Sequence, residues 1–257
     1  MCTLILLDRV VPQIPVIVAA NRDEFFARPA APPTHFPAAG GRPAFAAPHD
    51  LEAGGTWMGI NEHGVFVGLT NRPVAAKPTG VRSRGLLVVD VLGAASAEHA
   101  GAAFDGQRDA AYAPFNLLAA DGREAWLARH TAEGERERRP LEPGIHVVCN
   151  RDPSDPSSTK VVRLRARLAE LDLAARPEAL VAELFRVLGG HPDPSNPFEN
   201  PCVHTAEYGT RSSSVLLAGP GRRAYWYADG APCETKYRDF TALLDDLHAP
   251  AGTRVRT

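Results

Sequence analysis

The feature that most constrains the fold is a series of short apolar, β-branched runs joined by turn residues. The first two runs cover residues 2–7 and 16–20, and a proline-containing turn over 8–15 joins them. Strands joined in this way are antiparallel. The end of the second strand, where the sequence reads "NRDE" (21–24), can therefore return to the neighbourhood of Cys2.

The same pattern recurs along the chain. A second hairpin is predicted over 56–60 and 65–70 and a third over 115–130, around Asp121 and Gly122. Further strands are expected at 144–150, 211–219 and 223–229; helices at 160–173 and 177–188; and a helical face within 85–103. Many hairpins with few helices indicate a layered α+β fold in one domain over residues 1–257.

Two segments are not predicted to form regular structure. Residues 27–50 contain six prolines and no helical period, so we expect an irregular surface loop that folds over a site. The mixed charges of "EGERERRP" (133–140) are interpreted as a solvated turn.

Charge and hydropathy limit the partners. The chain has 257 residues, 28 basic and 30 acidic, with a formal net charge of −2. There is no basic field for a nucleic-acid backbone, so a small molecule is the expected ligand. No apolar run approaches the roughly 18 residues that span a bilayer, and a secretory signal pattern is not found. Stable membrane insertion is not expected, and the predicted location is the cytoplasm.

The cysteines and histidines give no metal-binding pattern. The cysteines are far apart without a C-x-x-C pair, which argues against a zinc knuckle or a disulfide framework and fits a reducing compartment. They are Cys2, Cys149, Cys202 and Cys233. His35, His49 and His204 lack metal-ligand spacing, and His204 beside Cys202 is interpreted as structural. No metal and no cofactor are predicted.

The reactivity of Cys2 depends on whether Met1 is removed. If Met1 is removed, Cys2 carries a free α-amine, with a reference pKa of about 7.7–8.0, beside its own thiol. One residue then supplies both a nucleophile and a base. Arg22 can lower the thiol pKa, and Asp23 can hold the ammonium group.

Seven motifs identify a family resemblance. They are "MCTLILL", "AANRDEFFARP", "GGTWMGIN", "GLTNRP", "SRG", "FNLL" and "YGTRSSSVLL". Their order and spacing resemble the NRDE family, also called the transport and Golgi organization protein 2 family, from residue 2 to about residue 218. The resemblance implies an N-terminal nucleophile (Ntn) hydrolase-like fold, a four-layer αββα sandwich of two antiparallel sheets, and kinship with choloylglycine hydrolase and penicillin V acylase.

The resemblance also implies roles for individual residues. Cys2 matches the nucleophile, and Asp23 matches the aspartate that orients its amine. Asn71 resembles the oxyanion-hole side chain and Asn150 the second active-site asparagine. Ala20 stands where the acylases have arginine, so an activating cation has to come from Arg22 or elsewhere.

Other residues keep two interpretations. Arg22 either acts in catalysis or forms ion pairs with its neighbours that pin a loop. Trp57 is either part of the core or a wall of the substrate site. Arg211 either binds a substrate carboxylate or pairs with Asp23 or Glu24.

Three functions follow from the resemblance. The first is a cysteine amidohydrolase that cleaves a non-peptide C–N bond in a small hydrophobic or carboxylated substrate. The second is a non-catalytic protein that binds and carries haem, a lipid or acyl-CoA, in which Cys2 would be the axial ligand for haem. The third, an interaction protein of the secretory apparatus, is not favoured, because no targeting signal is found.

Overall fold

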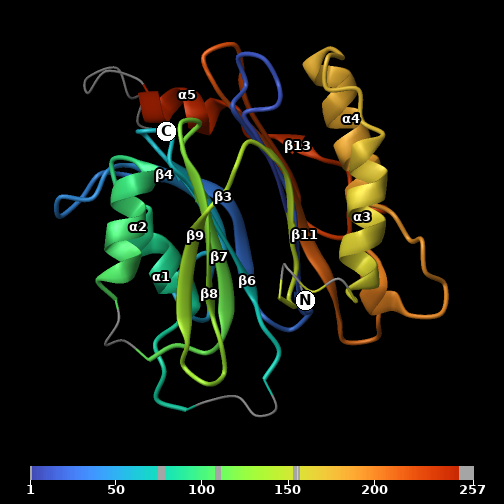
Figure 1. The fold of residues 1–257 in the computed structure, drawn as a ribbon, viewed down its shortest axis with the longest axis horizontal. Coiled ribbons are helices and arrows are strands. Elements are labelled where there is room, and N and C mark those ends of the chain that lie inside the picture. The colour runs from blue at the N-terminus through green and yellow to red at the C-terminus, as the bar shows by residue number, and fades with distance from the viewer. Residues whose placement is uncertain (1, 75–78, 108–110, 153–154, 156, 249–257) are drawn as a thin grey trace.

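Two antiparallel sheets face each other between two helical layers. The computed structural model describes residues 2–74, 79–107, 111–152, 155 and 157–248. In Figure 1 helices α3 and α4 lie on one side of the paired sheets, and α1 and α2 lie on the other. This is the predicted four-layer αββα arrangement.

The first sheet has six strands in the order β10-β1-β2-β11-β12-β13, so the two N-terminal strands lie in its middle. Its strands are β1 (Thr3–Asp8), β2 (Val16–Phe25), β10 (Gly144–Val148), β11 (Tyr208–Ala218), β12 (Arg223–Ala228) and β13 (Arg238–Asp239).

The second sheet has seven strands in the order β3-β4-β5-β6-β7-β8-β9. Every neighbouring pair in both sheets is antiparallel. Its strands are β3 (Ala30–Phe36), β4 (Phe45–Asp50), β5 (Met58–Asn61), β6 (Phe66–Asn71), β7 (Phe115–Ala120), β8 (Ala125–His130) and β9 (Arg136–Pro140).

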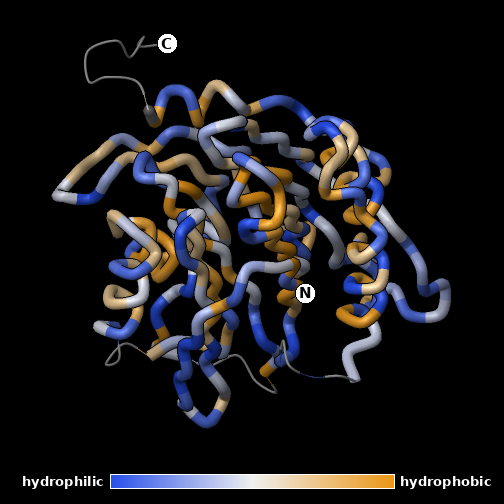
Figure 2. The backbone as a smooth tube through the Cα atoms, turned by 45° about the horizontal axis from the view of Figure 1, so that its top comes forward, coloured by the Kyte–Doolittle hydropathy of each residue, from blue (hydrophilic) through white to orange (hydrophobic). Residues whose placement is uncertain are grey.

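Strand β1 shows how one sheet serves two cores. All six of its residues are buried, because its side chains alternate between the two faces of the sheet and both faces are covered. Leu4 and Leu6 pack between the two sheets, whereas Ile5 and Leu7 pack toward α3 and α4. A third core joins the outer face of the second sheet to α1 and α2. Figure 2 shows hydrophobic segments concentrated in these interior strands and on parts of the helices.

The helices have local start signals. Ser83 and Ser96 each accept a hydrogen bond from a backbone N–H of the first turn, which satisfies a donor that the helix cannot pair. The helices are α1 (Arg84–Val91), α2 (Ala97–Asp105), α3 (Thr159–Ala169), α4 (Pro177–Leu188), the 3₁₀ turn η1 (Pro197–Glu199) and α5 (Ala242–His248).

The three predicted hairpins are confirmed as β1–β2, β5–β6 and β7–β8. The predicted helices α3 and α4 are present as well. The helical face expected within 85–103 is divided between α1 and α2.

The prediction of an irregular loop over 27–50 is wrong. This segment forms β3 and β4, which pair with each other. Pro32 and Pro33 are tolerated because β3 is an edge strand and they lie where its register shifts between Ala31 and Thr34. The consecutive prolines Pro32 and Pro33 were therefore a signal of an edge strand and a bulge.

The interpretation of 133–140 as a solvated turn is also wrong in part. Its second half forms β9, which pairs with β8 at the other edge of the same sheet. Nearly all of β9 is exposed, so the strand keeps charged side chains, as edge strands commonly do.

Within the described residues, no helix is long and apolar enough to cross a membrane. Met1 and residues 249–257 lie outside the described residues, so one domain over 1–257 stays a prediction.

Candidate active site

The β1–β2 hairpin brings Cys2 back to the "NRDE" segment. Thr3 at the start of β1 is paired with Asn21 on β2. The Cys2 thiol lies 3.9 Å from the backbone carbonyl oxygen of Asp23. The backbone N–H of Cys2 donates to Asn150 Oδ1 at 2.7 Å. The hairpin register thus places Cys2 beside Asp23, and the pairing of β1 with β10 brings Asn150 to it.

Asn150 joins Cys2 to Asn71. Its Oδ1 accepts from the Cys2 nitrogen, and its Nδ2 donates to the backbone carbonyl of Asn71. The N–H and carbonyl partners fix which end of the amide is oxygen. Asn71 is among the residues that line the cleft described below. The geometry therefore makes Asn150 an orienting group for the Cys2 nitrogen, while Asn71 is the asparagine that lines the cleft.

The segment that carries Asn150 is held by two residues that the sequence did not single out. Asn116 Nδ2 donates to the carbonyls of Cys149 and Arg151, at 2.8 and 3.0 Å. Thr70 Oγ1 donates to the Cys149 carbonyl at 2.7 Å. The available signal was a polar residue inside each of the predicted strands "FNLL" and "GLTN".

Asp23 points from β2 toward the α3 layer. Its Oδ1 accepts from Thr210 Oγ1 at 2.6 Å, and its Oδ2 lies 3.9 Å from Lys160 Nζ. Both charged side chains are buried. Burial raises the pKa of the Asp23 carboxyl above its usual value, and Lys160 and Thr210 reduce this shift. Lys160 had no predicted role, because its contact with Asp23 joins segments that are remote in sequence.

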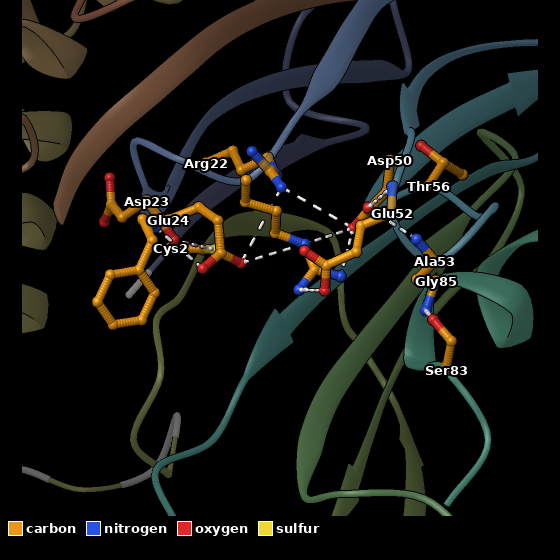
Figure 3. A network of polar contacts seen from close by, with 12 residues as sticks. Cys2, Arg22, Asp23, Glu24, Asp50, Glu52, Ala53, Thr56, Ser83 and Gly85 are labelled. Atoms are coloured by element: carbon orange, nitrogen blue, oxygen red, sulfur yellow. Dashed lines mark hydrogen bonds and ion pairs between the residues drawn. The ribbon is translucent and has the colours of Figure 1, made fainter. Parts of the chain in front are cut away.

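Arg22 lies on the opposite face of β2, as the alternation of a strand requires. Its guanidinium carbon is 4.4 Å from the centre of the Trp57 ring. Figure 3 shows Arg22 directed toward Glu24 and Asp50, at 4.0 and 3.9 Å from its Nη2. These ion pairs are long, and Nη1 is buried without a hydrogen-bond partner among the described residues. Both proposed uses of Arg22 thus remain compatible with its position.

Several of these residues line one cleft with a volume of about 470 Å³, but Asn150 is not among its lining residues. Arg28 and Asp50 also line it, so the 27–50 segment does flank the cleft as expected. The cleft-lining residues predicted from the sequence are Cys2, Arg22, Asp23, Trp57 and Asn71.

Arg211 is placed differently. It is the residue at the register shift between Thr210 and Ser212 on β11, and it is not among the residues that line the cleft. Its role in binding a carboxylate stays a prediction.

The electrostatic environment of Cys2 has opposing components. Burial raises the pKa of the thiol above its usual value, and the Asp23 carboxylate adds to the rise, whereas Arg22 counteracts it. Arg84 also lines the cleft. Its Nη1 donates to the Pro114 carbonyl at 2.8 Å, and it forms no ion pair with any carboxylate in the described part of the chain.

Solved structures with a similar fold define the class. An N-acylethanolamine-hydrolyzing acid amidase ortholog from Caenorhabditis elegans superposes with a TM-score of 0.56 and 15% identity, over 84% of this chain and 92% of that chain. A conjugated bile acid hydrolase from Clostridium perfringens superposes with a TM-score of 0.52 and 14% identity, over 95% and 94%. The fold is that of the Ntn hydrolases.

Sequence comparison gives the family. The chain belongs to the Transport and Golgi organisation 2 family, whose model matches residues 1–227. The Bos taurus Transport and Golgi organization protein 2 homolog is 30% identical over 227 residues, which cover 79% of this chain and 81% of that protein. The Homo sapiens homolog is 27% identical over 227 residues, with the same two coverages of 79% and 81%. The resemblance inferred from the motifs is confirmed.

The buried Asp23 predicts a pH-dependent effect of Thr210→Val. Because the folded-state pKa of Asp23 is raised, the stability linked to this carboxyl is present below the unfolded pKa of about 3.9 and is lost as pH rises through the folded value. The Thr210 hydroxyl lowers the folded pKa, so its removal increases that loss. We expect Thr210→Val to lower the free energy of unfolding in urea titrations by about 1–3 kcal/mol at neutral pH, and by less at about pH 4.

Thr210→Ser is the matched control, because it keeps the hydroxyl and removes only a methyl group. Thr210 Oγ1 also accepts from the Val203 N–H at 2.9 Å, and losing that bond should cost the same at every pH. If Thr210→Val lowers the free energy of unfolding by the same amount at every pH, the coupling to Asp23 is contradicted.

Proposed function

We propose that this protein is an N-terminal cysteine amidohydrolase that cleaves a non-peptide C–N bond of a small hydrophobic or carboxylated substrate. The observation that carries the proposal is that Cys2, which lines the cleft, contacts Asn150 through its nitrogen and the backbone carbonyl of Asp23 through its thiol. In addition, two proteins of similar fold are by name hydrolases of an N-acylethanolamine and of conjugated bile acids.

In the proposed reaction, removal of Met1 turns the Cys2 nitrogen into an α-amine that takes the thiol proton. The sulfur adds to the amide carbonyl carbon, and the oxygen becomes an oxyanion that the Asn71 side chain stabilises. The C–N bond then breaks as the ammonium proton passes to the leaving nitrogen, which leaves a thioester. Water adds to the thioester and gives its proton to the amine, and cleavage of the C–S bond releases the acid.

The surroundings of Cys2 support this division of roles. Asn150 orients the nitrogen through Oδ1, while its Nδ2 is already used by the Asn71 carbonyl. In the proposed reaction the buried Asp23 carboxylate would stabilise the ammonium form of the amine, and Lys160, 3.9 Å from that carboxylate, offsets its burial. Because burial raises the pKa of the Cys2 thiol, transfer of its proton to an adjacent amine is needed to form the nucleophile.

The cleft supports a substrate with an apolar part and a carboxylate. Most guanidinium groups at its wall already have acidic partners: Arg28 pairs with Asp50, and Arg82 with Asp90. Arg84 is partly buried and has no such partner among the described residues, and burial lowers its pKa. A substrate carboxylate would supply the missing negative charge.

A second candidate is a carrier of a hydrophobic carboxylated ligand, such as haem, a lipid or acyl-CoA. The observation in its favour is that burial raises the pKa of the Cys2 thiol, which disfavours the thiolate nucleophile. Exposed Phe25 and Phe26 follow "NRDE", and Phe25 lines the cleft, so apolar contact surface is also present. No histidine lines the cleft among the described residues, so haem iron would take the Cys2 sulfur, which would lose its proton on binding.

The first test of this function compares two forms of the same chain, with Met1 retained and with Met1 removed, as identified by intact mass. Only the processed form should hydrolyse N-acyl amino acids or N-acylethanolamines and form a thioester detectable by mass, because only it has the amine base. Cys2→Ala should abolish both signals, whereas Cys149→Ala, a change on the α3 side of the sheet, should keep them.

Equal turnover by both forms would contradict the amine as the base. If neither form hydrolyses any amide, and Cys2→Ala shifts the absorption spectrum of bound haem, the carrier is supported in place of the enzyme.

Asn71→Ala should separate transition-state stabilisation from binding. Loss of one oxyanion donor lowers kcat by roughly 10² to 10³, with little change in KM. Asn61→Ala is the comparison, because that asparagine is buried at the end of β5 and caps a turn without lining the cleft. A kcat for Asn71→Ala within twofold of wild type would remove Asn71 from the proposed mechanism.

Arg84→Met tests the carboxylate. Loss of a charged hydrogen bond, about 1.5–3 kcal/mol, should raise KM for an N-acyl amino acid by roughly 10-fold or more and leave KM for the neutral N-acylethanolamine unchanged. Arg82→Met is the matched control, because that guanidinium is already paired with Asp90. An equal rise in KM for both substrates would show that Arg84 does not bind the substrate carboxylate.

A further inference from the structure

Four metal-ligating side chains meet at one point outside the cleft. One ligand atom from each of His191, Cys202, His204 and Cys233 lies within 4.8 Å of all the others. None of the four residues lines the cleft around Cys2. All are remote in sequence except Cys202 and His204, which explains why ligand spacing did not indicate them.

The distances within the cluster are close to those of a tetrahedral zinc site, with one sulfur–nitrogen distance shorter. The two sulfurs are 3.6 Å apart, and His204 Nε2 is 3.5 Å from the Cys202 sulfur and 3.1 Å from the Cys233 sulfur. With Zn–S of about 2.3 Å and Zn–N of about 2.0–2.1 Å, tetrahedral geometry requires about 3.8 Å between sulfurs and about 3.6 Å between sulfur and nitrogen. At 3.6 Å the two sulfurs are in contact but not bonded, and both thiols are free.

We propose that these four residues bind a structural Zn²⁺ ion. Two thiolates and two imidazoles are a typical zinc ligand set, and four protein ligands leave no open position for catalysis. Each thiol loses its proton to solvent as the ion binds, and zinc undergoes no redox change. Cys202 is buried and the other three residues are exposed, so the ion lies near the surface and within reach of a chelator.

The ion would tie three segments of the chain together. His191 follows α4, Cys202 and His204 precede β11, and Cys233 lies between β12 and β13. The first two segments are already held against β2, because Asn21 Nδ2 donates to the carbonyls of Leu188 and Pro201 at 2.9 Å each. The zinc site would therefore stabilise the segment that leads into Thr210, the partner of Asp23.

The test measures zinc in the untagged, reduced full chain by elemental mass spectrometry. Wild type should contain about one zinc ion per chain, and Cys202→Ser/Cys233→Ser less than about a tenth of that. Cys149→Ser and His63→Ala, which change a buried thiol and an exposed imidazole elsewhere, should keep the metal.

A second measurement does not depend on how the double variant folds. Chelator-treated wild type should lose thermal stability and should regain it with Zn²⁺. With Co²⁺ it should develop thiolate-to-cobalt charge-transfer absorption. His191→Ala should weaken metal binding by on the order of 10-fold or more.

Three results would each overturn the zinc site. The first is reduced wild type that neither contains zinc nor develops the cobalt absorption. The second is a folded double variant that binds zinc as wild type does. The third is a Cys202–Cys233 disulfide, found by peptide mapping, in protein purified without oxidant.

Discussion

The structure depends on the burial of both faces of β1 and β2 in the middle of the six-stranded sheet. A sheet covered on both faces needs a second sheet on one side and helices on the other, and this requirement produces the four layers. The same alternation divides the "NRDE" segment. Asn21 and Asp23 face the α3 and α4 layer, while Arg22 faces the second sheet and the cleft. The alternation of side chains on strands that are buried on both faces thus determines both the layers and the positions of the candidate site residues.

The candidate site carries an electrostatic cost that the surrounding contacts offset. A carboxylate as buried as Asp23 is unfavourable unless it is paired and hydrogen-bonded. Lys160 supplies the charge from α3, and Thr210 supplies the hydroxyl from β11. Asp23 therefore connects the central sheet to the helical layer next to Cys2. Asn116 and Thr70 act in a comparable way on the second sheet, because they hold the backbone on which Asn150 lies.

The sequence predicted strands correctly where short apolar runs were joined by turn residues. It did not predict the two edge strands of the second sheet. β3 contains consecutive prolines and β9 is almost entirely charged, so neither resembles an interior strand. Both are compatible with an edge, where one row of backbone groups needs no strand partner. A window of sequence cannot tell that its segment lies at an edge, because this depends on which strands pair with it.

The sequence by itself determined the antiparallel character of the sheets, the family and the return of "NRDE" to Cys2, because these follow from local periodicity, short turns and contiguous motifs. Only the tertiary structure decided which groups meet across long separations. Lys160 lies beside Asp23, Asn150 contacts Cys2 through Oδ1, and Cys233 joins Cys202 and His204. Arg211 is at a strand irregularity and not at the cleft wall. Each of these placements depends on how separate strands and helices pack, and spacing along a chain carries no information about that.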